Sequence, residues 1–166
     1  MTVHPRTHRA RRAFYSDLTV QPGLPGKTRI LTMSGAIPIH SLQAGERIIT
    51  RETGATKLLG MESLTRLTDL VAFHRLAVEG AGGLVTTILP AEQPVFLRDW
   101  RAQALFGAEQ ALVAAHRLVD EEFVTRRVPQ NMDLFHLYFD TPQIVYVEGM
   151  ELGAGSPAQP STKARA

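Results

Sequence analysis

The chain has 166 residues, of which 44% are hydrophobic and 20% charged, as expected for one folded domain with its own core. It contains no cysteine, which excludes disulfides, thiolate metal sites and thiol nucleophiles. The net charge is only +2, and no apolar run reaches the ~20 residues of a membrane-spanning helix. Since no signal-peptide core follows the N-terminus either, we expect a cytoplasmic protein without membrane insertion, with export without a cleaved leader as the open alternative.

Residues 1–20 form a basic segment without apolar periodicity, which predicts a flexible arm. The arm could contact nucleic-acid phosphates, or it could simply be solvated. No matching basic face is predicted in the rest of the chain, so nucleic-acid binding is an alternative hypothesis that fails if removing the arm leaves retention on heparin or DNA unchanged. Its basic residues are Arg6, Arg9, Arg11 and Arg12.

A single domain is predicted over residues 21–152, between a Pro/Gly-rich hinge at 21–26 and a tail at 153–166 that lacks large apolar residues. Short β-branched or alternating segments separated by turns predict many short strands. Residues 109–120 predict a helix, with apolar positions at three-and-four spacing. The expected fold is therefore mostly β with one or two short helices. The predicted strands are 29–32, 37–40, 46–51, 57–61, 70–78, 84–89, 95–97, 123–128, 134–139 and 143–147.

Three sequence blocks form a recognisable pattern: the first runs from Thr28-Arg29-Ile30 to Thr50, the second covers 97–119, and the third covers 135–149. Together they resemble the bacterial Hedgehog/intein-like (Hint) domain family. Their order and spacing match the family across residues 21–152. The resemblance implies a compact Hint-like β-fold of many short strands, in a family whose active members cleave themselves.

The resemblance also indicates which positions would perform self-cleavage. That reaction needs a side-chain nucleophile at the first domain residue, a position at which this chain has Gly23. A histidine that polarises or protonates the scissile amide is replaced by Gln93, and a second histidine slot holds Pro142. An amide does not exchange protons near neutral pH, and proline offers neither donor nor base. We therefore expect no catalytic residues.

Three polar side chains fall where the family often has functional groups and could form a residual site: His116, His136 and Asp140. The simpler interpretation is that each histidine packs with one ring nitrogen bonded to the backbone. The spacing of the six histidines does not favour a metal site, and we expect no cofactor.

The sequence therefore favours a non-catalytic Hint-like domain that acts as a binding or assembly module for a protein partner not identified by its residues. An alternative is an active self-cleaving domain with a serine or threonine nucleophile. The second alternative is a nucleic-acid-associated protein acting through the basic arm.

Overall fold

The computed structural model describes residues 23–76 and 84–157, whose strands form two sheets. One sheet contains, in spatial order, β1 (Leu24–Pro25), β10 (Val124–Phe139), β6 (Gly60–Leu76) and β7 (Leu84–Pro90), with β13 (Ser156–Pro157) paired to β10. The other contains β3 (Gly35–Pro38), β2 (Arg29–Thr32), β4 (Arg47–Thr50), β11 (Gln143–Val147), β12 (Met150–Ala154), β8 (Pro94–Leu97) and β9 (Ala111–Ala114), with β5 (Gly54–Lys57) paired to β4. Helical segments are η1 (Ile39–Ser41), α2 (Trp100–Phe106) and η2 (Ala115–Leu118). The predicted mostly-β fold is confirmed.

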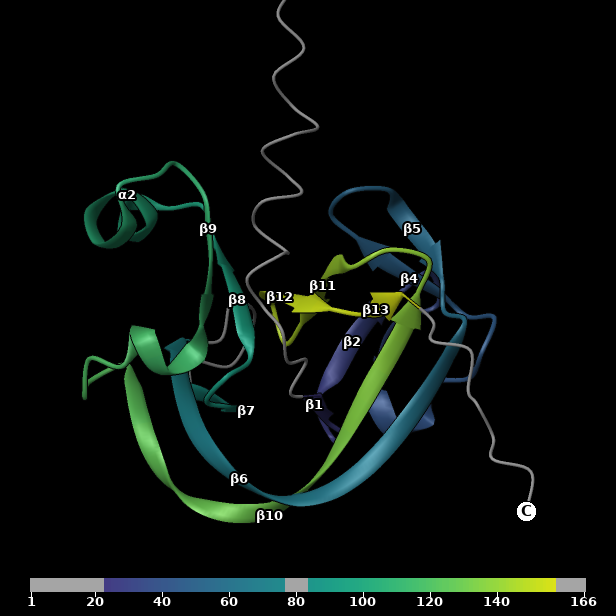
Figure 1. Cartoon of the computed structure of the whole chain (residues 1–166), viewed down its shortest axis with the longest axis horizontal. Helices are drawn as coiled ribbons and strands as arrows, with labels where there is room; N and C mark the ends of the chain where they lie inside the picture. Colours follow the sequence, from purple (N-terminus) through teal and green to yellow (C-terminus); the bar gives the residue numbers. More distant parts are fainter. Residues whose placement is uncertain (1–22, 77–83, 158–166) are drawn as a thin grey trace, which may run out of the picture.

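The two longest strands, β6 and β10, run antiparallel as one curved ribbon that connects the two ends of the molecule (Figure 1). The predicted strands 123–128 and 134–139 are therefore parts of a single strand, interrupted by a register shift between Arg127 and Gln130. Pro129 lies within this shift and has no N–H to donate to a regular ladder. The middle of the ribbon was not predicted because its side chains are largely exposed and so lack the alternation of a half-buried strand.

Alternating side chains of the second sheet fill the core. In β2, Ile30 and Thr32 are buried while their neighbours are exposed, and Ile48 and Thr50 repeat the pattern in β4. The fully buried residues include Ile30, Ile39, Ile48, Leu58, Leu89, Leu134, Phe139 and Leu152. Except for Leu134, these residues belong to one hydrophobic cluster that joins both sheets.

The helix predicted over 109–120 is wrong. Residues Ala111–Ala114 form β9, which pairs with β8, and a short 3-10 turn follows. Ala111 and Val113 are both buried, so the segment also satisfies a period of two, and pairing with β8 decided between the two patterns. The α-helix lies earlier, at α2, where Asp99 caps its N-terminus and Gly107 ends it with a φ of 66°.

The chain remains in the fold beyond residue 152, the boundary predicted for the tail. β12 extends to Ala154, and β13 pairs with β10. Small side chains allow this segment to lie against the core, so the lack of large apolar residues did not indicate solvent exposure. No helix within the described ranges is long and apolar enough to span a membrane.

Candidate functional site

Two of the three positions identified with self-cleavage lie at the same small cavity. Gly23 immediately precedes β1, and Gln93 lies in the turn between β7 and β8. The cavity has a volume of about 10 Å³, room for about one water molecule. Its wall consists of Gly23, Leu24, Gln93, Phe135, His136, Leu137, Gly153, Ala154 and Gly155.

Strand pairing explains how residues far apart in the sequence meet there. Leu24 in β1 pairs with Phe135 in β10, which places Gly23 beside His136. Leu152 in β12 pairs with Val95 in β8, which brings the 153–155 segment to the start of β8. The cavity therefore lies where the two sheets meet.

Gly23 has a backbone conformation and surroundings that exclude a side chain. Its φ is 81°, in the left-handed region that favours glycine. A Cβ built there would lie 2.9 Å from Leu134 Cβ and 3.3 Å from His136 Nε2. A nucleophilic side chain at this position would require both strain and displacement of β10, and glycine supplies no attacking atom.

Gln93 is a buried structural clamp. Its side chain is 1% exposed, and Nε2 donates to the carbonyl oxygens of Pro94 at 3.0 Å and Gly153 at 2.8 Å. Its backbone carbonyl accepts a hydrogen bond from the N–H of Ala115. The side-chain amide therefore connects the β7–β8 turn to β12, and its N–H groups are used in structural hydrogen bonds, while the backbone carbonyl connects the turn to η2.

His136 is the titratable side chain in the cavity wall. Burial lowers its pKa below the ordinary value of 6.5; repulsion from Arg66 lowers it further, and the negative charge of Glu62 opposes the shift. The neutral imidazole is therefore the form present at neutral pH. It can accept or donate one hydrogen bond but lacks a nucleophile beside it to activate.

The other predicted site residues lie elsewhere. His116, in η2, has Nε2 3.5 Å from Glu92 Oε1. Asp140 is exposed in the turn after β10, and Pro142 is half-buried just before β11. None of these three lines the Gly23–Gln93 cavity, so the structure does not bring His116, His136 and Asp140 together as one site.

Gly153 and Gly155 also line the cavity, although both were predicted to lie in a solvated tail. Gly155 has a φ of 87°, and a Cβ there would lie 2.6 Å from Phe139 Cδ2. The alternation of Met150, Leu152 and Ala154 before it is the signal that indicates a strand rather than a tail. Gly155 therefore allows the chain to pass close to β10, whereas Gly153 lies against Pro94 of β8.

Within residues 23–76 and 84–157, no group of three or more His, Cys, Asp or Glu side chains is arranged to hold a metal ion. The basic arm with Arg6, Arg9, Arg11 and Arg12 lies outside the described residues.

Comparison with known proteins identifies the family. Residues 22–154 match the family model described as the Hint domain. Among curated proteins, no sequence matches the chain.

Solved intein structures share the fold at low sequence identity. The Msm DnaB1 intein splicing domain bound with zinc superposes with a TM-score of 0.53 at 12% identity, over 80% of this chain and 99% of that chain. The bacterial intein-like domain from Clostridium thermocellum superposes with a TM-score of 0.51 at 16% identity, over 83% of this chain and 100% of that chain. These likenesses concern the fold alone, and the family match covers most of the sequence. The chain belongs to the Hint domain family.

Proposed function

We propose that this protein is a Hint domain that has lost self-cleavage and acts as a binding or assembly module for a protein partner. The observation that carries the proposal is the environment of Gly23. The position equated with the nucleophile has no side chain, and β10 fills the space into which one would project.

The surrounding groups do not replace the missing chemistry. Thr28, the nearest hydroxyl that follows Gly23 in the sequence, donates its Oγ1–H to the carbonyl oxygen of Pro25 at 2.6 Å and does not line the cavity. Gln93 cannot act as an acid or base near neutral pH. An ester-forming attack would therefore lack its nucleophile, and the slot equated with the histidine that releases the scissile amide holds no acid or base.

The alternative, an active domain using a serine or threonine nucleophile, is separated from this proposal by intact-mass spectrometry. The purified chain is expected to keep its full mass during prolonged incubation. A product lacking residues 1–22, produced without added protease, would overturn the proposal.

A pair of variants tests the loss of mechanism directly. Gly23→Cys restores a nucleophile, and Gly23→Ala is its matched control because both variants introduce the same Cβ strain at a φ of 81°. We expect neither to cleave when thiols are added, since the slot equated with the acid-base histidine holds Gln93 and a Cβ at residue 23 meets Leu134 in β10. Thiol-induced cleavage of the cysteine variant alone would show that the proton-transfer residues lie elsewhere.

A further inference from the structure

A second and larger cavity lies away from the Gly23–Gln93 site. Its volume is about 590 Å³, within the range of roughly 300 to 1,000 Å³ typical of small-molecule sites. It opens between one end of the β6–β10 ribbon and the part of the second sheet formed by β8 and β12. The two cavities share no wall residue.

The wall combines apolar surface with guanidinium groups. Phe73, Phe96, Phe123 and Tyr146 contribute aromatic rings, and Val95, Leu97, Leu118 and Met150 contribute aliphatic surface. Arg75, Arg98 and Arg101 line the same space, with Asp99 and Glu151 as the wall's carboxylates. This composition differs from a simple core gap, because cations line a space that is large and open to solvent.

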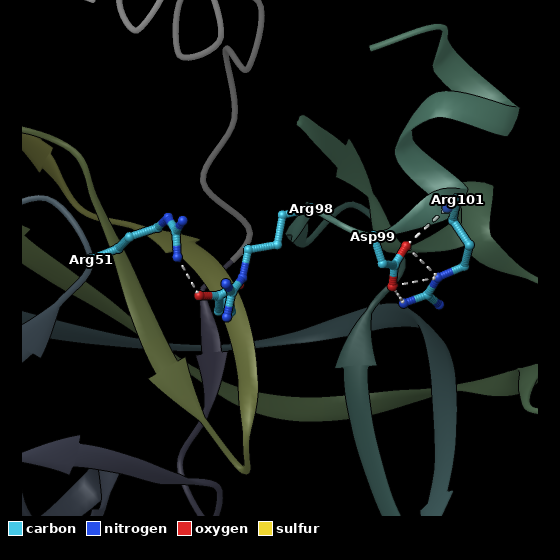
Figure 2. A network of polar contacts seen from close by, with 5 residues as sticks. Arg51, Arg98, Asp99 and Arg101 are labelled. Carbon is cyan, nitrogen blue, oxygen red and sulfur yellow. Dashed lines mark hydrogen bonds and ion pairs between the residues drawn. The ribbon is translucent and has the colours of Figure 1, made fainter. Parts of the chain in front are cut away.

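Two arginines share one of these carboxylates (Figure 2). Arg51 Nη1 lies 2.9 Å from Glu151 Oε1, and Arg98 Nε lies 3.0 Å from Glu151 Oε2. Each carboxylate oxygen therefore faces a different guanidinium, and the three groups together carry an excess positive charge. Arg51 also stacks over Phe96, with Cζ 4.9 Å from the ring centroid.

Arg101 and Asp99 form a separate pair beside this cluster (Figure 2). Arg101 Nη2 lies 2.8 Å from Asp99 Oδ2, and Asp99 also accepts a hydrogen bond from the Arg101 backbone N–H. These contacts neutralise Arg101 locally. The excess charge at the cavity therefore comes from Arg75 and from the two arginines that share Glu151, of which Arg98 lines the wall and Arg51 lies behind it.

Arg75 is the cation that lacks a carboxylate partner. Its Nη2 donates to Thr87 Oγ1 at 3.0 Å, and its buried Nε has no hydrogen-bond partner. Within residues 23–76 and 84–157, no carboxylate forms an ion pair with it. Burial lowers the pKa of the guanidinium, and the negative charge of Glu148 only partly opposes the shift. Guanidinium nevertheless stays charged at neutral pH, so the cavity is lined by a partly buried cation without an ion-pair partner.

We propose that this cavity binds a carboxylate attached to an aromatic or aliphatic body, with Arg75 and Arg98 contacting the carboxylate and the aromatic wall covering the body. Planar guanidinium groups match carboxylates in a two-pronged geometry, and the apolar wall favours a ligand that loses water on binding. The ligand could be a free small molecule or the carboxyl end of a peptide. The inference extends the proposed binding role but does not depend on the loss of self-cleavage, because the two cavities are separate.

Calorimetric titration of the full chain tests the proposal with two matched pairs of probes. The first pair, 2-naphthoate and 2-naphthamide, represents small molecules; the second, N-acetylphenylalanine and its amide, represents a peptide end. Binding of either carboxylate about tenfold tighter than its amide supports the proposal and identifies the source of the ligand. The proposal is overturned if neither carboxylate binds, or if each binds no more tightly than its amide.

Three variants locate the site. Arg75→Gln is expected to weaken carboxylate binding about tenfold, whereas Asp99→Asn is expected to strengthen it, because it removes a negative charge from the wall and keeps a side chain that caps helices well. Arg47→Gln makes the same charge change as the first variant on an exposed strand position outside the cavity. Equal effects of Arg75→Gln and Arg47→Gln would overturn the assignment. Arg98→Gln, at a side chain 58% exposed, provides the same test if Arg75→Gln does not fold.

Discussion

Replacing Gln93 with methionine tests whether this residue is a structural clamp. Methionine keeps a similar side-chain volume but removes the two hydrogen bonds from Nε2 to the carbonyl oxygens of Pro94 and Gly153. A buried acceptor that loses its partner costs about 1–3 kcal/mol, and two acceptors are affected in a region where the side chain is 1% exposed. Because methionine restores some apolar burial, we expect the free energy of unfolding to fall by about 2 kcal/mol.

Urea denaturation followed by circular dichroism measures this difference, with equal m-values required for the comparison. Gln103→Met is the matched control, because the same substitution is made at an exposed position of α2. The control is expected to change stability by less than about 0.5 kcal/mol. If both variants lose the same stability, the clamp is not a significant part of the fold, and Gln93 would have to be explained in another way.

Three further predictions concern other parts of the fold. Gly155→Ala should lower the free energy of unfolding by about 2 kcal/mol or more, because a Cβ would meet Phe139 at a φ of 87°; an unchanged melting temperature would contradict the packing described. NMR titration should place the pKa of His136 below 6.5, and a pKa at or above 6.5 would contradict the effect of burial. Between the pKa of the unfolded chain and the lower pKa of the folded chain, the unfolded chain binds more protons. The folded state therefore loses stability as the pH falls through that interval. Asp99→Ala should lower the free energy of unfolding, measured by urea denaturation, by about 1 kcal/mol, because it removes the acceptor of the Arg101 N–H. Asp99→Asn should retain most of that stability, since asparagine also caps helices well. Equal losses in the two variants would rule out capping as the cause.

Much of the candidate site could be predicted from the sequence, because the chemistry depends on residue type. Gly23 and Gln93 were identified as positions without a nucleophile or an acid-base group, and the structure places both at one cavity. Pro142 was grouped with them by order in the sequence but lies outside the cavity wall. A motif gives the order of residues along the chain, and the turn between β10 and β11 decides where the side chain lies.

The second cavity could not be predicted. Arg75 and Glu151 belong to separate strands, and no local pattern indicates that an arginine in a β-rich segment will be partly buried without an ion-pair partner. Strand pairing and packing of the two sheets determine which charges meet. The same is true of β9, where pairing with β8 overrode the helical spacing of the segment.

The sequence by itself determined the mostly-β class, the Hint family blocks and the absence of a thiol nucleophile, because these depend on residue type, alternation and order along the chain. Only the tertiary structure decided that Gly23, Gln93 and His136 share a cavity, that residues 153–155 remain in the fold, and that arginines from different strands line a second cavity. The physical reason is that long-range strand pairing and side-chain packing bring together residues that are widely separated in the chain.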